Sequence, residues 1–127
     1  MKFPKTIFVK HCPELCSVRK KFLTEHLEER LEETGIVDIR WIEDYNWDHP
    51  FVQWLNIKLK LPYGPKLTSN FVKTLMMFKQ MVDEDIEDAI LLDDDVTFHK
   101  DWKELFEEIP DEAAINTYIN LSASPFF

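Results

Sequence analysis

The sequence predicts an α/β domain with a mainly parallel sheet and flanking helices. Short β-branched or alternating apolar segments take turns with longer segments of helical periodicity, in the order β-α-β-α-α-β-α-β. A second observation is that charged residues directly follow three of the predicted strands. At 127 residues, the chain has the length of one domain, so we expect a single domain over 1–127.

The first strand is predicted at 6–10, because "TIFVK" is short, β-branched and apolar. Pro13 fits the first turn of a helix, where its missing N–H has no consequence, and Gly35 is expected to end that helix. The second strand is predicted at 36–42, where apolar and charged residues alternate. The expected apolar stripe of the helix consists of Leu15, Val18, Phe22, Leu27 and Leu31.

A helix behind Pro50 is predicted over 49–59, followed by a loop. Thr68 or Ser69 is expected to cap the next helix. The apolar stripe of that helix is predicted to be Phe71, Leu75, Phe78 and Val82. The remaining elements are a third strand at 88–92, a short helix at 99–109 and a fourth strand at 113–121.

Charge and composition exclude several classes of function. With 15 basic and 24 acidic residues, the net charge of −9 disfavours nucleic acid or an anionic membrane as partner. No stretch is apolar for long enough to span a bilayer, and the opening residues lack the apolar core of a leader, so a cytosolic protein is expected. Cys12 and Cys16 match neither a redox pair nor a zinc set and are interpreted as plain thiols.

Glycine is too scarce for the common phosphate-binding loops. Only Gly35 and Gly64 occur, whereas a dinucleotide fingerprint needs three glycines and a P-loop needs two at fixed spacing. In parallel sheets, ligands bind beyond the carboxyl ends of the strands. The candidate site is therefore the group of residues that follows the strands, namely Lys10–His11, Glu43–Asp44 and Asp93–Asp95.

Three consecutive aspartates end the buried-type segment "AILL". On an extended chain, Asp93 and Asp95 point one way and Asp94 the other. Two such carboxylates repel by about 4 kcal/mol at an effective dielectric constant of 20, and a divalent cation removes that repulsion. Mg²⁺ takes one or two carboxylates together with substrate phosphates, so the motif predicts a metal that grips a diphosphate. A solvated acidic turn is the alternative.

Two other families place a similar motif differently. "LLDDDVT" satisfies the opening motif of haloacid-dehalogenase phosphatases, with Asp93 as nucleophile, Asp95 as acid/base and Thr97 on the phosphate. That family begins with the motif and needs further lysine and aspartate motifs long after it, whereas this motif lies late in the chain. A receiver domain would carry its acidic pair after the first strand, where "KHC" stands. The position disfavours both.

Three segments carry a resemblance to a known family: "IFVKHCPELCSVRKKFLTEHL", "LTSNFVKTLMMFKQMV" and "AILLDDDVTF". Together they resemble the nucleotide-binding half of GT-A glycosyltransferases. The closer likeness is to glycosyltransferase family 25 and to related domains of large double-stranded DNA viruses. The chain departs from that pattern in having Asp93 where glutamate is usual and Lys73 near the usual position of a histidine. The acceptor-binding half is expected to be missing.

The resemblance implies a metal-dependent glycosyltransferase that uses Mn²⁺ or Mg²⁺. Asp95 would ligate the metal, Asp93 would ligate it or hold the donor ribose, and Asp94 would lie toward the donor sugar. The donor would be a nucleotide sugar, a UDP-sugar first of all, and the acceptor a glycan or glycoprotein. No catalytic base or nucleophile can be named. A nucleotide-sugar-binding or interaction module without turnover is the second hypothesis. His99 could complete the metal shell, although an exposed loop histidine explains it better.

Five further residues are candidates for contact with the nucleotide. Lys10 and His11 could face the base or the phosphates. Arg19 could grip a diphosphate with its fork of donors, or belong to a solvated helix face. Asp44 could bond the ribose or base, or form an ordinary turn. Lys73 could reach the ligand, or lie on the surface. The aromatic residues best placed for stacking are Tyr45 and Trp47.

Overall fold

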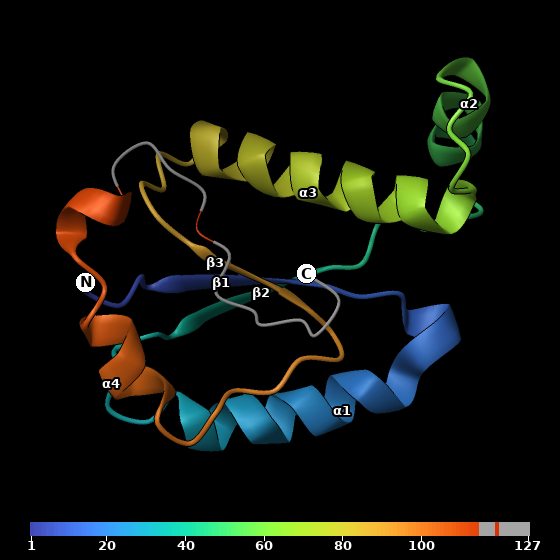
Figure 1. Ribbon diagram of the computed structural model, residues 1–127. Coiled ribbons are helices and arrows are strands. Elements are labelled where there is room, and N and C mark those ends of the chain that lie inside the picture. The colour runs from blue at the N-terminus through green and yellow to red at the C-terminus, as the bar shows by residue number, and fades with distance from the viewer. Residues whose placement is uncertain (115–118, 120–127) are drawn as a thin grey trace. The chain divides into compact units, whose positions relative to one another are not determined.

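The computed structural model describes residues 1–114 and 119 (Figure 1). These residues form two compact units, of which the larger is Pro4–Thr97. The smaller combines Met1–Phe3 with the described residues from Phe98 onward. The helices and strands follow the predicted order as far as the last predicted strand.

Three parallel strands form an open sheet in the larger unit. Strand β1 (Thr6–Lys10) lies between β2 (Asp38–Ile42) and β3 (Ile90–Asp93), giving the order β2-β1-β3. Lys10 is level with Ile42 on one side and with Asp93 on the other. The three carboxyl ends therefore meet at one edge, and the predicted parallel α/β architecture is confirmed. In β1, the side chains of Ile7, Phe8 and Val9 are fully buried, as a central strand covered on both faces requires.

Helix α1 (Pro13–Arg30) covers one face of the sheet and α3 (Pro65–Asp83) covers the other (Figure 1). Leu23, Leu27 and Leu31 turn the second half of α1 toward the core. The predicted stripe is wrong at two positions, because Val18 is 79% exposed and Phe22 is 58% exposed, while the side chain of Leu15 falls outside the described part of the chain. Leu23 lies one residue, and hence about 100° of rotation, from Phe22, and the buried face follows Leu23.

The end of α1 also differs from the prediction. The helix stops at Arg30, with Leu31 as its cap, rather than continuing to Gly35. The hydroxyl of Thr34 donates to the Leu31 carbonyl at 2.7 Å and accepts from the Ile36 amide at 3.2 Å. These bonds close a turn between the helix and the next strand, so that Gly35, with φ of +79°, lies within the connecting turn.

Helix α2 (Pro50–Lys58) lies close to its predicted position and buries Val52. Helix α3 begins at Pro65, directly after Gly64, so the expected caps Thr68 and Ser69 lie inside the helix and are buried. Pro65 sets the first turn, and the positive φ of Gly64 lets the chain enter it. The prediction of the helix start was therefore wrong by three or four residues.

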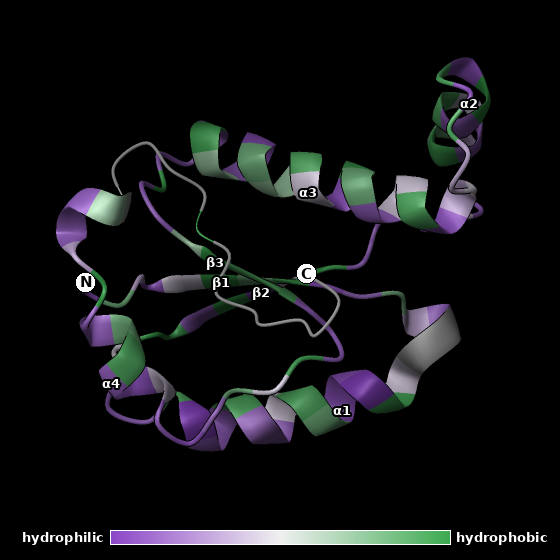
Figure 2. Ribbon diagram, viewed as in Figure 1, coloured by the Kyte–Doolittle hydropathy of each residue, from purple (hydrophilic) through white to green (hydrophobic). Residues whose placement is uncertain are grey.

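The apolar stripe of α3 points away from the core. Its residues are between 43% and 80% exposed, which corrects the expectation that they form the buried face. The stripe comprises Phe71, Leu75, Phe78 and Val82. The side turned inward instead carries Thr68, Ser69, Val72, Lys73 and Met77. Figure 2 shows hydrophobic residues recurring along the whole of α3. The inward side is held by polar bonds, since Thr68 donates to Asn56 Oδ1 at 2.7 Å and Ser69 donates to the Tyr45 carbonyl at 2.6 Å.

Helices α2 and α3 end in the same way. After α2, the amides of Lys60 and Leu61 donate to the carbonyls of Ile57 and Asn56. After α3, the amides of Asp85 and Ile86 donate to the carbonyls of Val82 and Met81. Both are Schellman motifs, whose first residue beyond the cap takes a left-handed backbone. Lys60 has φ of +51° and Asp85 has φ of +56° there, where glycine is usual.

In the smaller unit, helix α4 (Trp102–Glu107) precedes a 3-10 helix (Asp111–Ala114). The rings of Trp102 and Phe106 each lie 5.2 Å from that of Phe3. Residues 113 and 114 of the predicted fourth strand close the 3-10 helix, and the rest of that prediction falls outside the described residues apart from position 119. Among the helices described, none has the length and apolar character needed to cross a bilayer.

Candidate functional site

The candidate site lies where the strand order reverses. From β1 the chain moves to β2 on one side and later to β3 on the other, so β1 and β3 flank the switch point. Open α/β sheets bind their ligands beyond the strands at this point. The residues that follow these two strands are His11 and Asp94.

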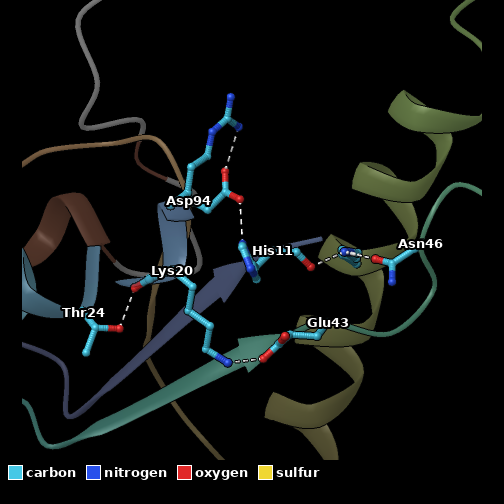
Figure 3. Close-up of polar contacts among 8 residues, drawn as sticks. His11, Lys20, Thr24, Glu43, Asn46 and Asp94 are labelled. Carbon is cyan, nitrogen blue, oxygen red and sulfur yellow. Dashed lines mark hydrogen bonds and ion pairs between the residues drawn. The ribbon is translucent and has the colours of Figure 1, made fainter. Parts of the chain in front are cut away.

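Asp94 joins three elements in this region (Figure 3). One carboxylate oxygen lies 2.8 Å from Nδ1 of His11, and the other lies 3.3 Å from the guanidinium of Arg19 on α1. The His11 side chain is fully buried, while that of Arg19 is half exposed. The three aspartates alternate as expected. Asp94 points inward, toward His11 and Arg19, while Asp93 and Asp95 are exposed.

The second ring nitrogen of His11 is buried without a hydrogen-bond partner among the described residues. Because Nδ1 faces a carboxylate, the neutral ring carries its proton there, and Nε2 is left as a bare acceptor. The Trp41 ring lies edge-on to the imidazole, with centroids 5.6 Å apart. A buried polar atom without a partner is rare, and it marks His11 as able to accept one further hydrogen bond.

Lys73 is the most deeply buried charged residue of the site, at 4% exposure. Its ammonium donates to the backbone carbonyl of His11 at 2.6 Å and to Asn46 Oδ1 at 2.7 Å. Burial lowers the pKa of Lys73 below its ordinary value of 10.5, against the attraction of nearby acidic groups, among them Asp94 and Asp44. The surface location considered for Lys73 is therefore wrong, and the residue fixes the end of β1 to the loop after β2.

Two further ion pairs lie at the strand ends. Lys10 lies 3.2 Å from the carboxylate of Asp93, and its ammonium is 3.4 Å from the hydroxyl of Thr74 on α3. Lys20 of α1 pairs with Glu43 directly after β2. The strand ends thus carry cations and carboxylates in matched pairs, and a ligand with phosphates can exchange with the carboxylates for the same cations.

The fit of a divalent metal depends on Asp93 and Asp95. Both are exposed, and their hard carboxylate oxygens are the donors that Mg²⁺ and Mn²⁺ prefer. Within the described part of the chain, no three side chains of the His, Cys, Asp or Glu types stand close enough together to hold a metal. These residues therefore suit a cation that takes its remaining ligands from phosphates and water, and they do not suit a cation enclosed by protein.

The structure does not bring the other predicted residues as close to the ends of β1 and β3. Asp44 is exposed in the loop after β2, and its charge acts on Lys73 without a direct bond. Tyr45 is also in that loop, with its ring 4.8 Å from that of His49. Trp47 has a buried indole nitrogen without a hydrogen-bond partner among the described residues, and its backbone carbonyl accepts from Gln53. His99 belongs to the smaller unit, where it is exposed and accepts from the Asp101 amide.

Three site residues were not singled out from the sequence: Lys20, Asn46 and Thr74. Lys20 stands next to Arg19, and Thr74 stands next to Lys73, so each has a neighbour that was a candidate. Asn46 follows β2 by four residues and could have been found by extending the strand-end rule into the loop.

Comparisons with known protein families, characterised proteins and solved structures give no match for this chain. The functional argument therefore depends on the geometry of the strand ends.

Proposed function

We propose that this chain is the donor-binding domain of a metal-dependent, GT-A-like glycosyltransferase, and that it binds a nucleotide sugar, a UDP-sugar first of all. The observation that carries the proposal is the meeting of Lys10, His11 and Asp93–Asp95 at the switch point of a parallel sheet. Cations for a diphosphate, carboxylates for a metal and a buried acceptor lie on adjacent strand ends. The resemblance of "AILLDDDVTF" to the metal motif of these enzymes supports the same assignment.

Each residue has a role that follows from its contacts. A diphosphate would meet two cations that already bind carboxylates, namely Arg19, which is half exposed, and Lys10, whose side chain is 12% exposed. Because Nε2 of His11 is buried, His11 would hold Asp94 in place through Nδ1 rather than touch the nucleotide itself. Lys73 would keep the loop after β2 in place rather than touch the ligand, because both its bonds go to protein groups.

Mn²⁺ or Mg²⁺ would be held by Asp93 and Asp95, and when bound it would neutralise charge on the leaving diphosphate. Asp93 would then release Lys10, whose ammonium becomes available to a phosphate oxygen. Asp94 would stay bonded to His11 and Arg19. The metal would thus need only Asp93 and Asp95, and the third aspartate would have a structural role.

Calorimetric titration of UDP into the full chain, with and without Mn²⁺, tests the proposal. We expect binding that requires the metal, and we expect Asp95→Ala to abolish it. Asp88→Ala is the matched control, because Asp88 is an exposed aspartate that precedes β3 rather than following it. Absence of binding to UDP, GDP and CMP with metal present, or equal losses in both variants, would contradict the proposal.

Turnover separates the enzyme from a binding module of the same fold. The chain could be the donor-binding domain of an active glycosyltransferase, or a domain that binds the donor without transferring it. Release of UDP from UDP-sugars, measured with this chain and with glycan or glycoprotein acceptors, distinguishes these two functions. Metal-dependent binding without UDP release would assign the binding module.

A further inference from the structure

A continuous apolar face runs along the outer side of α3. Its five residues are each more than two-fifths exposed: Leu67, Phe71, Leu75, Phe78 and Val82. We call this set the α3 face. Single exposed apolar side chains are ordinary on protein surfaces, whereas a contiguous row marks a surface that another body covers. The opposite side of the same helix supplies Lys73, which fixes the end of β1, so the α3 face needs its own explanation.

The spacing along the α3 face is that of a helix-pairing seam. Successive members are four, four, three and four residues apart, which keeps them on one narrow stripe. Helix α3 has 19 residues and is therefore about 28 Å long. A second helix of similar length, carrying the same kind of stripe, would bury all five residues at once.

Charge identifies the direction in which such a helix would lie. The exposed lysines Lys58, Lys60 and Lys66 lie before or at the start of α3. The opposite end carries the exposed acidic residues Asp83, Glu84, Asp85 and Glu87, of which Asp83 pairs with Lys79 and Glu84 pairs with Arg40. A complementary partner must present acidic groups at the first end and basic groups at the second. This same chain, turned end for end, has that distribution.

We propose that the α3 faces of two copies of this chain pair in an antiparallel manner, with Leu75 at the two-fold axis. In this register, Leu67 faces Val82 of the second copy and Phe71 faces Phe78 of the second copy. A two-fold interface must be complementary to itself, and both the apolar stripe and the charges satisfy that condition. In the antiparallel arrangement, the positive end of each helix dipole also lies beside the negative end of the other, which is favourable.

Helix α2 extends this surface. It packs beside α3, with Asn56 bonded to Thr68 in the first turns of α3. Helix α2 and the loop after it expose a second apolar group: Phe51, Trp54, Ile57, Leu59 and Tyr63. In the antiparallel pair, the α2 end of one copy borders the acidic end of the other, so these residues enlarge the interface at both ends.

Sedimentation velocity of the full chain, over a wide range of concentration, tests the pairing. We expect a reversible dimer that Leu75→Glu converts to monomer, because the substitution places two like charges at the axis. Val18→Glu is the matched control, since Val18 is an exposed apolar residue on α1, and it should remain dimeric. Circular dichroism verifies that both variants are folded.

Two measurements test the register without depending on that variant. Under oxidising conditions, Leu75→Cys should form a disulfide-linked dimer in higher yield than wild type, whose native cysteines set the baseline, and than Val18→Cys. The dimer should also weaken as the ionic strength rises, because the basic end of one copy lies beside the acidic end of the other.

Three results would overturn the pairing: a chain that is monomeric at every concentration, a dimer that persists in folded Leu75→Glu, and a Leu75→Cys variant that does not cross-link above the baseline. A monomer in which the α3 face is protected from hydrogen exchange would mean that another segment of this chain covers it. Asp95→Ala should still dimerise, so failure of nucleotide binding and failure of pairing are separate results.

Discussion

Helices α1 and α3 cover opposite faces of one sheet in opposite ways. Helix α1 buries Leu23, Leu27 and Leu31 and exposes mostly charged residues, as an amphipathic helix against a core does. Helix α3 turns Thr68, Ser69 and Lys73 inward, beside Val72 and Met77, and turns its apolar stripe outward. Apolar burial therefore holds the first helix, whereas directed polar bonds contribute much of what holds the second.

The difference shows that a helix in a small α/β domain can serve two surfaces at once. The inner side of α3 supplies Lys73 and Thr74 to the strand ends, and polar groups are needed there. Its outer side carries the apolar residues that the core does not take. Variants of the two helices should therefore respond to different conditions.

The largest effect is expected from the core side of α1. Leu27→Ala should lower the free energy of unfolding by about 2–5 kcal/mol, because it leaves a cavity in a fully packed position. Leu75→Ala, on the α3 face, should lower it by less than about 1 kcal/mol in dilute solution, with a loss that grows with protein concentration. Urea unfolding at two protein concentrations measures both. A Leu75→Ala loss that is the same at both protein concentrations would contradict the proposed difference between the two helices.

The next effect concerns the buried lysine. Lys73→Met should destabilise the chain by about 1–3 kcal/mol at neutral pH, since the His11 carbonyl and Asn46 lose their buried donor. The folded pKa of Lys73 is lowered, so the folded state loses its proton first as the pH rises toward 10.5. Wild type therefore gains stability relative to the variant through that window. Unfolding in urea from neutral to alkaline pH measures the difference.

Lys21→Met is the matched control for this effect, because Lys21 is an exposed lysine on α1. Its difference from wild type should be small and should not change with pH. A Lys73→Met difference that shrinks as the pH rises would show that burial does not disfavour the ammonium.

A smaller effect is expected at the contact between β1 and β3. Asp94→Asn keeps an acceptor near His11 and loses the charge, which should lower stability by about 1 kcal/mol. At a pH where the His11 ring is neutral, the wild-type proton should be on Nδ1, and the variant should shift part of it to Nε2. Nitrogen chemical shifts of the imidazole report the tautomer. An unchanged tautomer would show that Asp94 does not orient the ring.

The smallest effect is expected at the exposed end of α3. Arg40 of β2 bonds Asp38 at 2.9 Å and Glu84 at 2.5 Å, and its guanidinium holds the pKa of Asp38 below its ordinary value of 3.8. The Asp38 side chain is 40% exposed, so Asp38→Asn should lower stability by less than about 1 kcal/mol after solvent screening.

That contribution depends on pH in the opposite direction from that of Lys73. It is fully present above pH 3.8 and is lost as the pH falls through the lowered folded pKa. Unfolding of wild type and Asp38→Asn between neutral and strongly acidic pH should converge at the acidic end. Asp48→Asn, in the exposed loop after β2, is the control and should remain equal to wild type throughout.

Periodicity predicted the elements of the larger unit and failed on the faces of its helices. The β1 and α2 predictions were close, since a short β-branched segment and a helix behind proline have local causes. The outward stripe of α3 could not be predicted, because the period of a pattern is the same whether a core or a partner covers it. The burial of Lys73 was missed for the same reason.

The candidate site was predicted as a neighbourhood and not as a set of bonds. Parallel strands bring Lys10, His11 and Asp93–Asp95 to one edge by topology alone. Which aspartate faces His11 depends on the turn after β3, and the contact of Arg19 with Asp94 depends on the rotation of α1 about its axis. Neither rotation nor turn geometry is encoded in residue spacing.

The Schellman motifs that close α2 and α3 have a consequence for how this chain can vary. Lys60 and Asp85 hold left-handed backbones that are less favourable than glycine by about 1 kcal/mol or more each. Those same residues belong to the basic and acidic ends of the α3 face. Glycine at both positions would make each copy more resistant to unfolding and would remove one charge from each end. At these two positions, a less favourable backbone conformation therefore accompanies the charges that make one end of the α3 surface basic and the other end acidic.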